Sequence, residues 1–140
     1  MDIEKLKEFI AKHEGKSNLL YEDSLGYATI GIGRCLDKKG LSDDEVFYLF
    51  NNDINEVLTD LRKIFKDFDN LPESVRLALA DMRFNLGRNG FRQFKKMIEA
   101  IKEKNFERAA VEALDSRWAK QVKNRALEDA ELIRDGMMGG

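Results

Sequence analysis

The 140-residue chain contains one cysteine, one histidine and one proline. A lone Cys35 cannot form an intramolecular disulfide, and one Cys with one His cannot by themselves build a structural zinc site. Disulfide scaffolds are therefore excluded, and we expect neither a metal site nor a cofactor. With 43% apolar residues, a chain of this length can bury a core without cross-links.

Long apolar runs are also absent from the sequence. No window approaches the ~20 apolar residues of a membrane span. Residues 1–15 alternate charged and apolar side chains instead of forming the apolar stretch of a signal peptide. We therefore expect a protein that is made in the cytoplasm without a signal peptide, does not insert into membranes, and needs another agent for export.

The net charge of −2 conceals an uneven distribution. Residues 1–60 carry 7 basic and 13 acidic side chains, whereas residues 61–140 carry 17 and 13. Most of the basic excess lies in one segment, which contains Arg83, Arg88, Arg92, Lys95, Lys96, Lys102 and Lys104. This segment favours binding of a polyanion, but a solvated helix face is an equally good interpretation.

The first third of the chain predicts one helix followed by a small sheet. Asp2 and Gly15 are helix start and stop signals around apolar residues at helical spacing. Short β-prone pieces follow at residues 19–21, 27–30 and 32–36, and glycines separate them. We therefore expect a tightly turned antiparallel sheet between residues 18 and 36.

The remaining two thirds predict helices. Ser42 and Glu45 form a capping box that opens a helix of about 25 residues, reaching Lys66. Pro72 begins a second helix that is apolar on nearly every side and should be buried at the centre. Shorter helices are expected over residues 91–102, 105–114, 116–122 and 124–134, before a frayed tail from residue 136.

These elements predict a mostly helical α+β class and a single domain, residues 1–140, with two lobes. We expect a small β lobe over about residues 15–60. The helical lobe would contain about residues 1–14 and 61–135, and the long helix would connect the two lobes.

Carboxylates, hydroxyls and glycines are concentrated between residues 14 and 33. Glu14 and Asp23 can face a common cleft, and two carboxyl groups in unlike environments can divide acid and base roles, as cleavage of a glycosidic bond requires. Thr29 lies on the second predicted strand, where its hydroxyl could orient a water molecule. The same residues also fit a structural interpretation, in which Glu14 is solvated and Asp23 forms a turn. Their spacing does not choose between these interpretations.

The order of the motifs carries more information than the spacing. Glu14-Gly15 is followed by Tyr-Glu-Asp at residues 21–23 and by Gly-Tyr-Ala-Thr-Ile-Gly-Ile-Gly at residues 26–33. The chain thereby resembles the phage-type lysozymes, glycoside hydrolase family 24, whose signature is a Glu, eight residues, an Asp, five residues and a Thr. The resemblance continues at residues 49–53, 84–87, 116–118 and 124–126, and so covers nearly the whole chain.

The resemblance implies a lysozyme-like fold and an endolysin activity. Such an enzyme hydrolyses the β-1,4 bond between N-acetylmuramic acid and N-acetylglucosamine in bacterial peptidoglycan, with inversion, and lyses the host cell. By the same resemblance, Glu14 is the general acid, Asp23 assists the attacking water or stabilises positive charge on the sugar, and Thr29 holds that water. We expect a monomer that binds no nucleic acid and reaches the peptidoglycan of the periplasm through a membrane pore.

The resemblance also implies binding residues, some of which differ from the family's usual ones. The predicted substrate-binding positions are Cys35, Phe84, Met97 and Glu112. Of these, Phe84 matches the family, whereas Leu, Ser and Asn are common at the other three positions. Arg125 matches an Arg beside the catalytic Glu. Arg34 replaces a common His, and we expect Arg34 to pair with Asp53.

Two alternative functions belong to other classes. A peptidoglycan-binding module without catalysis would be favoured if Glu14, Asp23 or Thr29 were replaced, and all three are present. A nucleic-acid binder would use the basic segment, but the acidic N-terminal half and the lack of a recognition motif argue against it.

Overall fold

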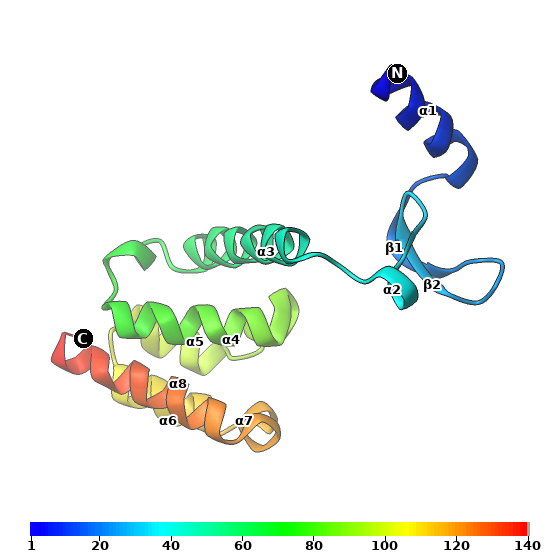
Figure 1. The fold of residues 1–140 in the computed structure, drawn as a ribbon. Coiled ribbons are helices and arrows are strands. Elements are labelled where there is room, and N and C mark those ends of the chain that lie inside the picture. Colours follow the sequence, from blue (N-terminus) through cyan, green and yellow to red (C-terminus); the bar gives the residue numbers. More distant parts are fainter. Residues whose placement is uncertain (140) are drawn as a thin grey trace. The chain divides into compact units, whose positions relative to one another are not determined.

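The computed structural model describes residues 1–139 and divides into two compact units, Met1–Leu49 (unit 1) and Phe50–Gly140 (unit 2) (Figure 1). Unit 1 contains α1 (Ile3–Glu14), three strands and α2 (Leu36–Lys39), and unit 2 is helical. The predicted mostly helical α+β class with a small antiparallel sheet is confirmed. The proposed lobe boundaries remain a prediction.

Local signals fix both ends of α1. Asp2 Oδ1 accepts a hydrogen bond from the Lys5 backbone N–H at 3.2 Å, as a helix N-cap does. At the other end Gly15 adopts a φ of 75°, which favours glycine, and its N–H bonds to the Ala11 carbonyl. The helix therefore ends at Glu14, immediately before the sheet.

The sheet has the order β1-β2-β3, with β1 at Ser17–Glu22, β2 at Ala28–Gly31 and β3 at Arg34–Cys35. Both pairings are antiparallel, and Thr29 on the central strand lies opposite Tyr21 and Cys35. The third β segment is shorter than predicted because Gly31 and Gly33, with φ values of 71° and 66°, form the turn before it and α2 begins directly after it.

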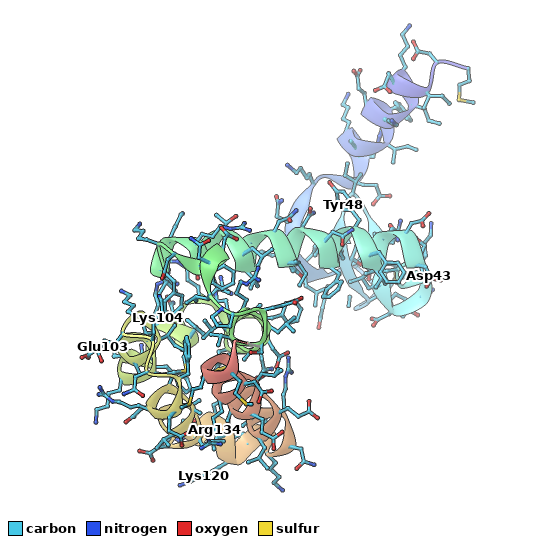
Figure 2. The ribbon with its side chains drawn as sticks, turned by 90° about the vertical axis from the view of Figure 1, so that its left-hand side faces the viewer. Asp43, Tyr48, Glu103, Lys104, Lys120 and Arg134 are labelled. Carbon is cyan, nitrogen blue, oxygen red and sulfur yellow. The ribbon has the colours of Figure 1, made fainter. Side chains whose placement is uncertain are left out.

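The long helix α3 spans Asp43–Ile64, two residues short of the predicted end, and Figure 2 labels Asp43 and Tyr48 near its start. The predicted capping box is confirmed. The Ser42 N–H donates to Glu45 Oε1 at 2.8 Å, and the Glu45 N–H donates to Ser42 Oγ at 3.2 Å. The helix begins in unit 1 and continues into unit 2.

Unit 2 is built on the helices that follow α3. These are α4 (Glu73–Arg92), α5 (Lys95–Lys102), α6 (Phe106–Leu114), α7 (Arg117–Val122) and α8 (Asn124–Asp135), with 3-10 turns at Phe68–Asn70 (η1) and Gly136–Met138 (η2). The apolar core lies entirely in this unit, and α6, α8 and α4 pack closely within it. Figure 1 shows α4, α6 and α8 side by side.

Two sequence predictions about this unit were wrong. Helix α4 is buried on one face, through residues such as Val75 and Leu79, and not on nearly every side, since Leu77 and Phe84 are exposed. Residues 136–138 of the predicted frayed tail form η2 instead, and the last residue of that tail, Gly140, lies outside the described residues. Gly136 is buried because its missing side chain lets the backbone lie against Val75 and Phe106.

Within residues 1–139, the structure contains no helix with both the length and the apolar character that crossing a bilayer requires.

Candidate active site

Glu14 is the last residue of α1, and its side chain lies against the turn between β2 and β3. A Cβ atom built on Gly33 in that turn would stand 2.7 Å from Glu14 Oε2. Glu14 is exposed, and no hydrogen bond within residues 1–139 engages its carboxyl group. Within unit 1, both carboxyl oxygens are therefore available to a ligand.

Asp23 shapes the turn between β1 and β2. Its Oδ1 accepts backbone hydrogen bonds from Leu25 and Tyr27, both at 2.9 Å. These bonds hold the carboxyl in one orientation and engage only one of its oxygens. The turn-forming interpretation of Asp23 is therefore correct, and the second oxygen is left for the predicted chemistry.

Thr29 is the one buried residue of unit 1, at 3% exposed. Its hydroxyl donates to the Tyr27 carbonyl at 3.0 Å, which leaves the hydroxyl oxygen able to accept. Half-buried Cys35 lies opposite Thr29 in the β2–β3 pairing. The structure thus brings Thr29 and Cys35 together, while their predicted roles remain predictions.

Arg34 forms an ion pair with Glu45 within unit 1. The sequence analysis expected a different partner, Asp53, which belongs to unit 2. Arg34 Nη2 lies 2.8 Å from Glu45 Oε2, and Nη1 also donates to the Gly40 carbonyl at 3.2 Å. The guanidinium, followed by the Ser42 N–H, lowers the pKa of Glu45 to about 2. This carboxylate serves both the capping box and the ion pair.

Met97 and Glu112 line one groove of unit 2, with a volume of about 820 Å³. Its apolar wall includes Leu86, Phe94 and Trp118, and its charged residues are Lys95, Lys96, Arg117, Glu112 and Asp115. Met97 is 1% exposed and so contributes to the floor, whereas Glu112 is half-buried. The groove offers an apolar surface beside charges of both signs.

Phe84 does not line this groove. It lies at a smaller hollow of about 150 Å³ with Asp53, Glu56, Val57 and Arg83, and its ring contacts that of Phe50 edge to face. The structure therefore separates Phe84 from the other two predicted binding residues of unit 2.

Arg125 forms a two-bond ion pair with Asp81, with distances of 2.9 and 2.7 Å. The guanidinium lowers the pKa of Asp81, as expected for a carboxylate beside Arg. Asp129 is 3% exposed. Its pKa changes in the opposite direction from that of Asp81. Burial, followed by the neighbouring Asp81 carboxyl, raises the pKa of Asp129 to about 8, and Asp129 Oδ2 is buried without a hydrogen-bond partner within the described residues. A buried carboxyl beside another carboxylate is more stable in its neutral form, so we assign a proton to Asp129.

Comparison with known proteins identifies the family. The phage lysozyme family model matches residues 11–134. The chain belongs to the phage lysozyme family. It is therefore a glycoside hydrolase of the lysozyme type, a peptidoglycan hydrolase.

Individual relatives are similar at lower identity. The chain is 26% identical to Probable T4-type lysozyme 2 of Dictyostelium discoideum, over 97% of each chain. It is also 26% identical to the pre-baseplate central spike protein Gp5 of Enterobacteria phage T4, over 94% of this chain and 28% of that protein. Identity to peptidoglycan hydrolase gp36 of Pseudomonas phage phiKMV is 24%, over 89% of this chain and 14% of the relative.

This lysozyme also contains buried charges that the sequence analysis missed. Asp60 is 7% exposed, and it binds Arg83 Nε at 2.6 Å and Arg92 Nη1 at 2.7 Å. Asp129 stands on the buried stripe of α8 that also contains Ala126 and Ile133. A charged residue in the middle of an apolar stripe was the available signal in both cases.

The basic segment of the lysozyme is less free than its sequence suggests. Arg83 and Arg92 both pair with Asp60, Arg83 also lies near Glu56, and Lys104 pairs with Asp67. The remaining four basic residues of the segment are exposed, and two of them, Lys95 and Lys96, line the groove. Within residues 1–139, no group of three His, Cys, Asp or Glu side chains could hold a metal ion.

Proposed function

We propose that this phage lysozyme is an endolysin that cleaves the β-1,4 bond between N-acetylmuramic acid and N-acetylglucosamine. The observation that carries the proposal is the position of Glu14: at the end of α1, against the β2–β3 turn, with a carboxyl group that no residue of its own unit binds. A proton donor must be able to reach the leaving oxygen, and the Glu14 carboxyl, unbound within its unit, is free to do so.

In the proposed reaction, Glu14 donates its proton to the leaving glycosidic oxygen. Asp23, through the oxygen that its turn does not use, assists an attacking water molecule or stabilises positive charge on the sugar. The Thr29 hydroxyl, which donates to Tyr27, accepts a hydrogen bond from that water. Inversion follows if water attacks the face opposite the leaving group, which requires carboxyl groups about 6.5–9.5 Å apart.

Both units contribute contacts to the polymer in this proposal. Cys35 acts from the sheet, and Phe84, Met97 and Glu112 act from unit 2. The groove of unit 2 suits a glycan with peptide branches, since its apolar wall can receive sugar faces and its charges of both signs can meet carboxylates and amines. We further propose that the enzyme works as a monomer, reaches the wall through a membrane pore and lyses the host cell.

A nucleic-acid binder is the weaker alternative, because ion pairs within unit 2 already engage three of the seven basic residues in the segment. A wall-binding module without catalysis would bind peptidoglycan and leave it intact. Measuring both binding and cleavage therefore separates the three functions.

The test is Glu14→Gln, which keeps the size of the side chain and removes the proton. The rate at which purified peptidoglycan loses turbidity should fall at least ~100-fold, while sedimentation with peptidoglycan should persist. Glu8→Gln, the same change earlier in α1, should keep the wild-type rate. Equal rates for wild type and Glu14→Gln would remove Glu14 from the mechanism.

Stereochemistry has its own measurement. Proton NMR of the first reducing sugar formed should detect the α anomer if the reaction inverts. A first product with the β configuration would overturn inversion and leave the lysozyme activity standing.

A further inference from the structure

The carboxyl group of Glu14 occupies the space that a side chain at residue 33 would need. A Cβ atom at Gly33 would lie 2.7 Å from Glu14 Oε2, 2.9 Å from Cδ and 3.2 Å from Cγ. Real Cβ atoms essentially never approach other heavy atoms within 3.0 Å. The carboxyl in its present position therefore requires glycine at this position.

The turn that contains Gly33 is held on both sides. The Thr29–Cys35 and Ile30–Arg34 pairs bracket it, and Arg34 is in turn bound to Glu45. Glu14, in contrast, ends an exposed helix, and its carboxyl group has no hydrogen bond within its unit. If a side chain were added at residue 33, the Glu14 carboxyl would move before the turn did.

A second glycine in the same turn provides a comparison. Gly31 and Gly33 have similar positive φ values, 71° and 66°, so replacement strains the backbone to a similar degree at both. A Cβ atom at Gly31 would meet nothing within 4 Å. Of the two, only Gly33 couples its missing side chain to Glu14.

We propose that Gly33 is a positioning residue of this lysozyme. Because it lacks a side chain, it leaves the space that the Glu14 carboxyl occupies against the β2–β3 turn. The inference rests on the proposed role of Glu14 as the acid. Misplacing a reacting group by about 1 Å can cost ~100-fold in rate. Filling the space at residue 33 should therefore affect catalysis more than folding.

The experiment compares Gly33→Ala with Gly31→Ala. Both variants should lose similar thermal stability, because both force alanine into a positive φ. Gly33→Ala should lower kcat about 30-fold or more with little change in KM, whereas Gly31→Ala should stay within about threefold of wild type. Equal losses of kcat in the two variants would overturn the inference.

A second readout follows the carboxyl itself. The carbon-13 NMR signal of the Glu14 carboxyl, assigned by its loss in Glu14→Gln, should move in Gly33→Ala and stay in place in Gly31→Ala. An unmoved signal in Gly33→Ala would overturn the inference even if activity fell.

Shortening the acid offers a rescue. Aspartate at position 14 withdraws the carboxyl by one methylene, so Glu14→Asp and Gly33→Ala together should lose less kcat than the product of their separate losses. If Gly33→Ala alone fails to fold, restoration of folding by Glu14→Asp supports the inference, and failure to restore it overturns the inference.

Failure of the inference differs from failure of the proposed function. Equal kcat losses in the two glycine variants, in an enzyme that Glu14→Gln inactivates, would overturn the positioning role alone. Full activity of Glu14→Gln would overturn the proposed function and the positioning role with it.

Discussion

Unit 1 buries a single side chain, that of Thr29, whereas unit 2 buries a continuous apolar core that includes Leu61, Leu79 and Ile133. Unit 1 by itself leaves apolar residues of α1, such as Phe9, uncovered. Hydrogen bonds at defined positions set its geometry, including the Asp23 turn and the Ser42–Glu45 capping box. The two units thus reach defined structures by different means.

The candidate catalytic residues and the apolar core therefore belong to different units. The candidate acid, its carboxyl partner and the candidate water-binding hydroxyl all belong to the unit with little core. Catalytic groups need open, directed polar atoms, and a packed core cannot expose them. The chain also offers a probe for each unit, since its tyrosines, Tyr21, Tyr27 and Tyr48, lie in unit 1 and Trp118 lies in unit 2.

The largest effect should come from Asp60→Ala, which tests whether unit 2 depends on packing alone. The change leaves the guanidinium of Arg83, 5% exposed, without its main partner, and it also releases Arg92. Removing one member of a buried ion pair typically costs about 3–5 kcal/mol. Thermal unfolding followed by Trp118 fluorescence should therefore shift strongly.

The matched control is Asp69→Ala, which breaks the exposed Arg62–Asp69 pair of the same unit. Exposed pairs contribute little to stability, so the Trp118 transition should hardly move. If Asp60→Ala shifted that transition no further than Asp69→Ala, the buried charges would not be part of what holds unit 2 together.

Residues such as Asp60 also explain where sequence analysis succeeded and where it stopped. Asp2, Gly15 and the Ser42–Glu45 capping box act over at most four residues, so they predicted helix ends to within about two residues. Asp60 pairs with a partner 23 positions away, and Asp81 with one 44 positions away. No local pattern contains such partners, because packing of the helices chooses them.

The same limit applies to the candidate site. The family resemblance predicts Glu14, Asp23 and Thr29 as site residues, since the order and spacing of the motif can be read from the sequence. The contact between Glu14 and Gly33 depends on how the β2–β3 turn meets the end of α1, and the glycine itself looked like an ordinary turn residue. Likewise, Phe84 and Met97 shared a predicted role, yet the structure puts them in different hollows.

An intermediate effect of opposite sign is expected from Asp129→Asn. Burial and the neighbouring Asp81 carboxyl raise the pKa of Asp129 to about 8, well above the ordinary value of an aspartate. Between about pH 4 and pH 8 the native state therefore holds a proton that the unfolded state has lost, and stability falls as the pH rises. Asparagine stays neutral at every pH, so the variant should be more stable at pH 8, on the order of 2 kcal/mol.

The measurement is the Trp118 transition as a function of pH. The stabilisation by Asp129→Asn should be near zero at pH 4 and should grow up to about pH 8. Glu128→Gln, at the neighbouring position on α8, should produce a much weaker trend because that side chain is exposed. A stabilisation that does not change with pH would show that Asp129 holds no proton in the native state.

The smallest effect should come from Glu45→Gln in unit 1, where the ion pair with Arg34 is partly open to solvent. Glutamine can keep the capping box through its one oxygen, so the charge interaction and one hydrogen bond from Arg34 are lost. The pKa of Glu45 is lowered to about 2, so its contribution is present above about pH 4.5 and disappears as the pH falls toward 2. The stability of unit 1 in the variant should therefore differ slightly from that in wild type at pH 6 and should match it near pH 2.

Tyrosine near-UV circular dichroism would follow this change in unit 1, and Trp118 fluorescence should stay constant. A Trp118 transition that moved as far as the tyrosine signal would mean that the two units do not respond separately, and the contrast between them would then fail.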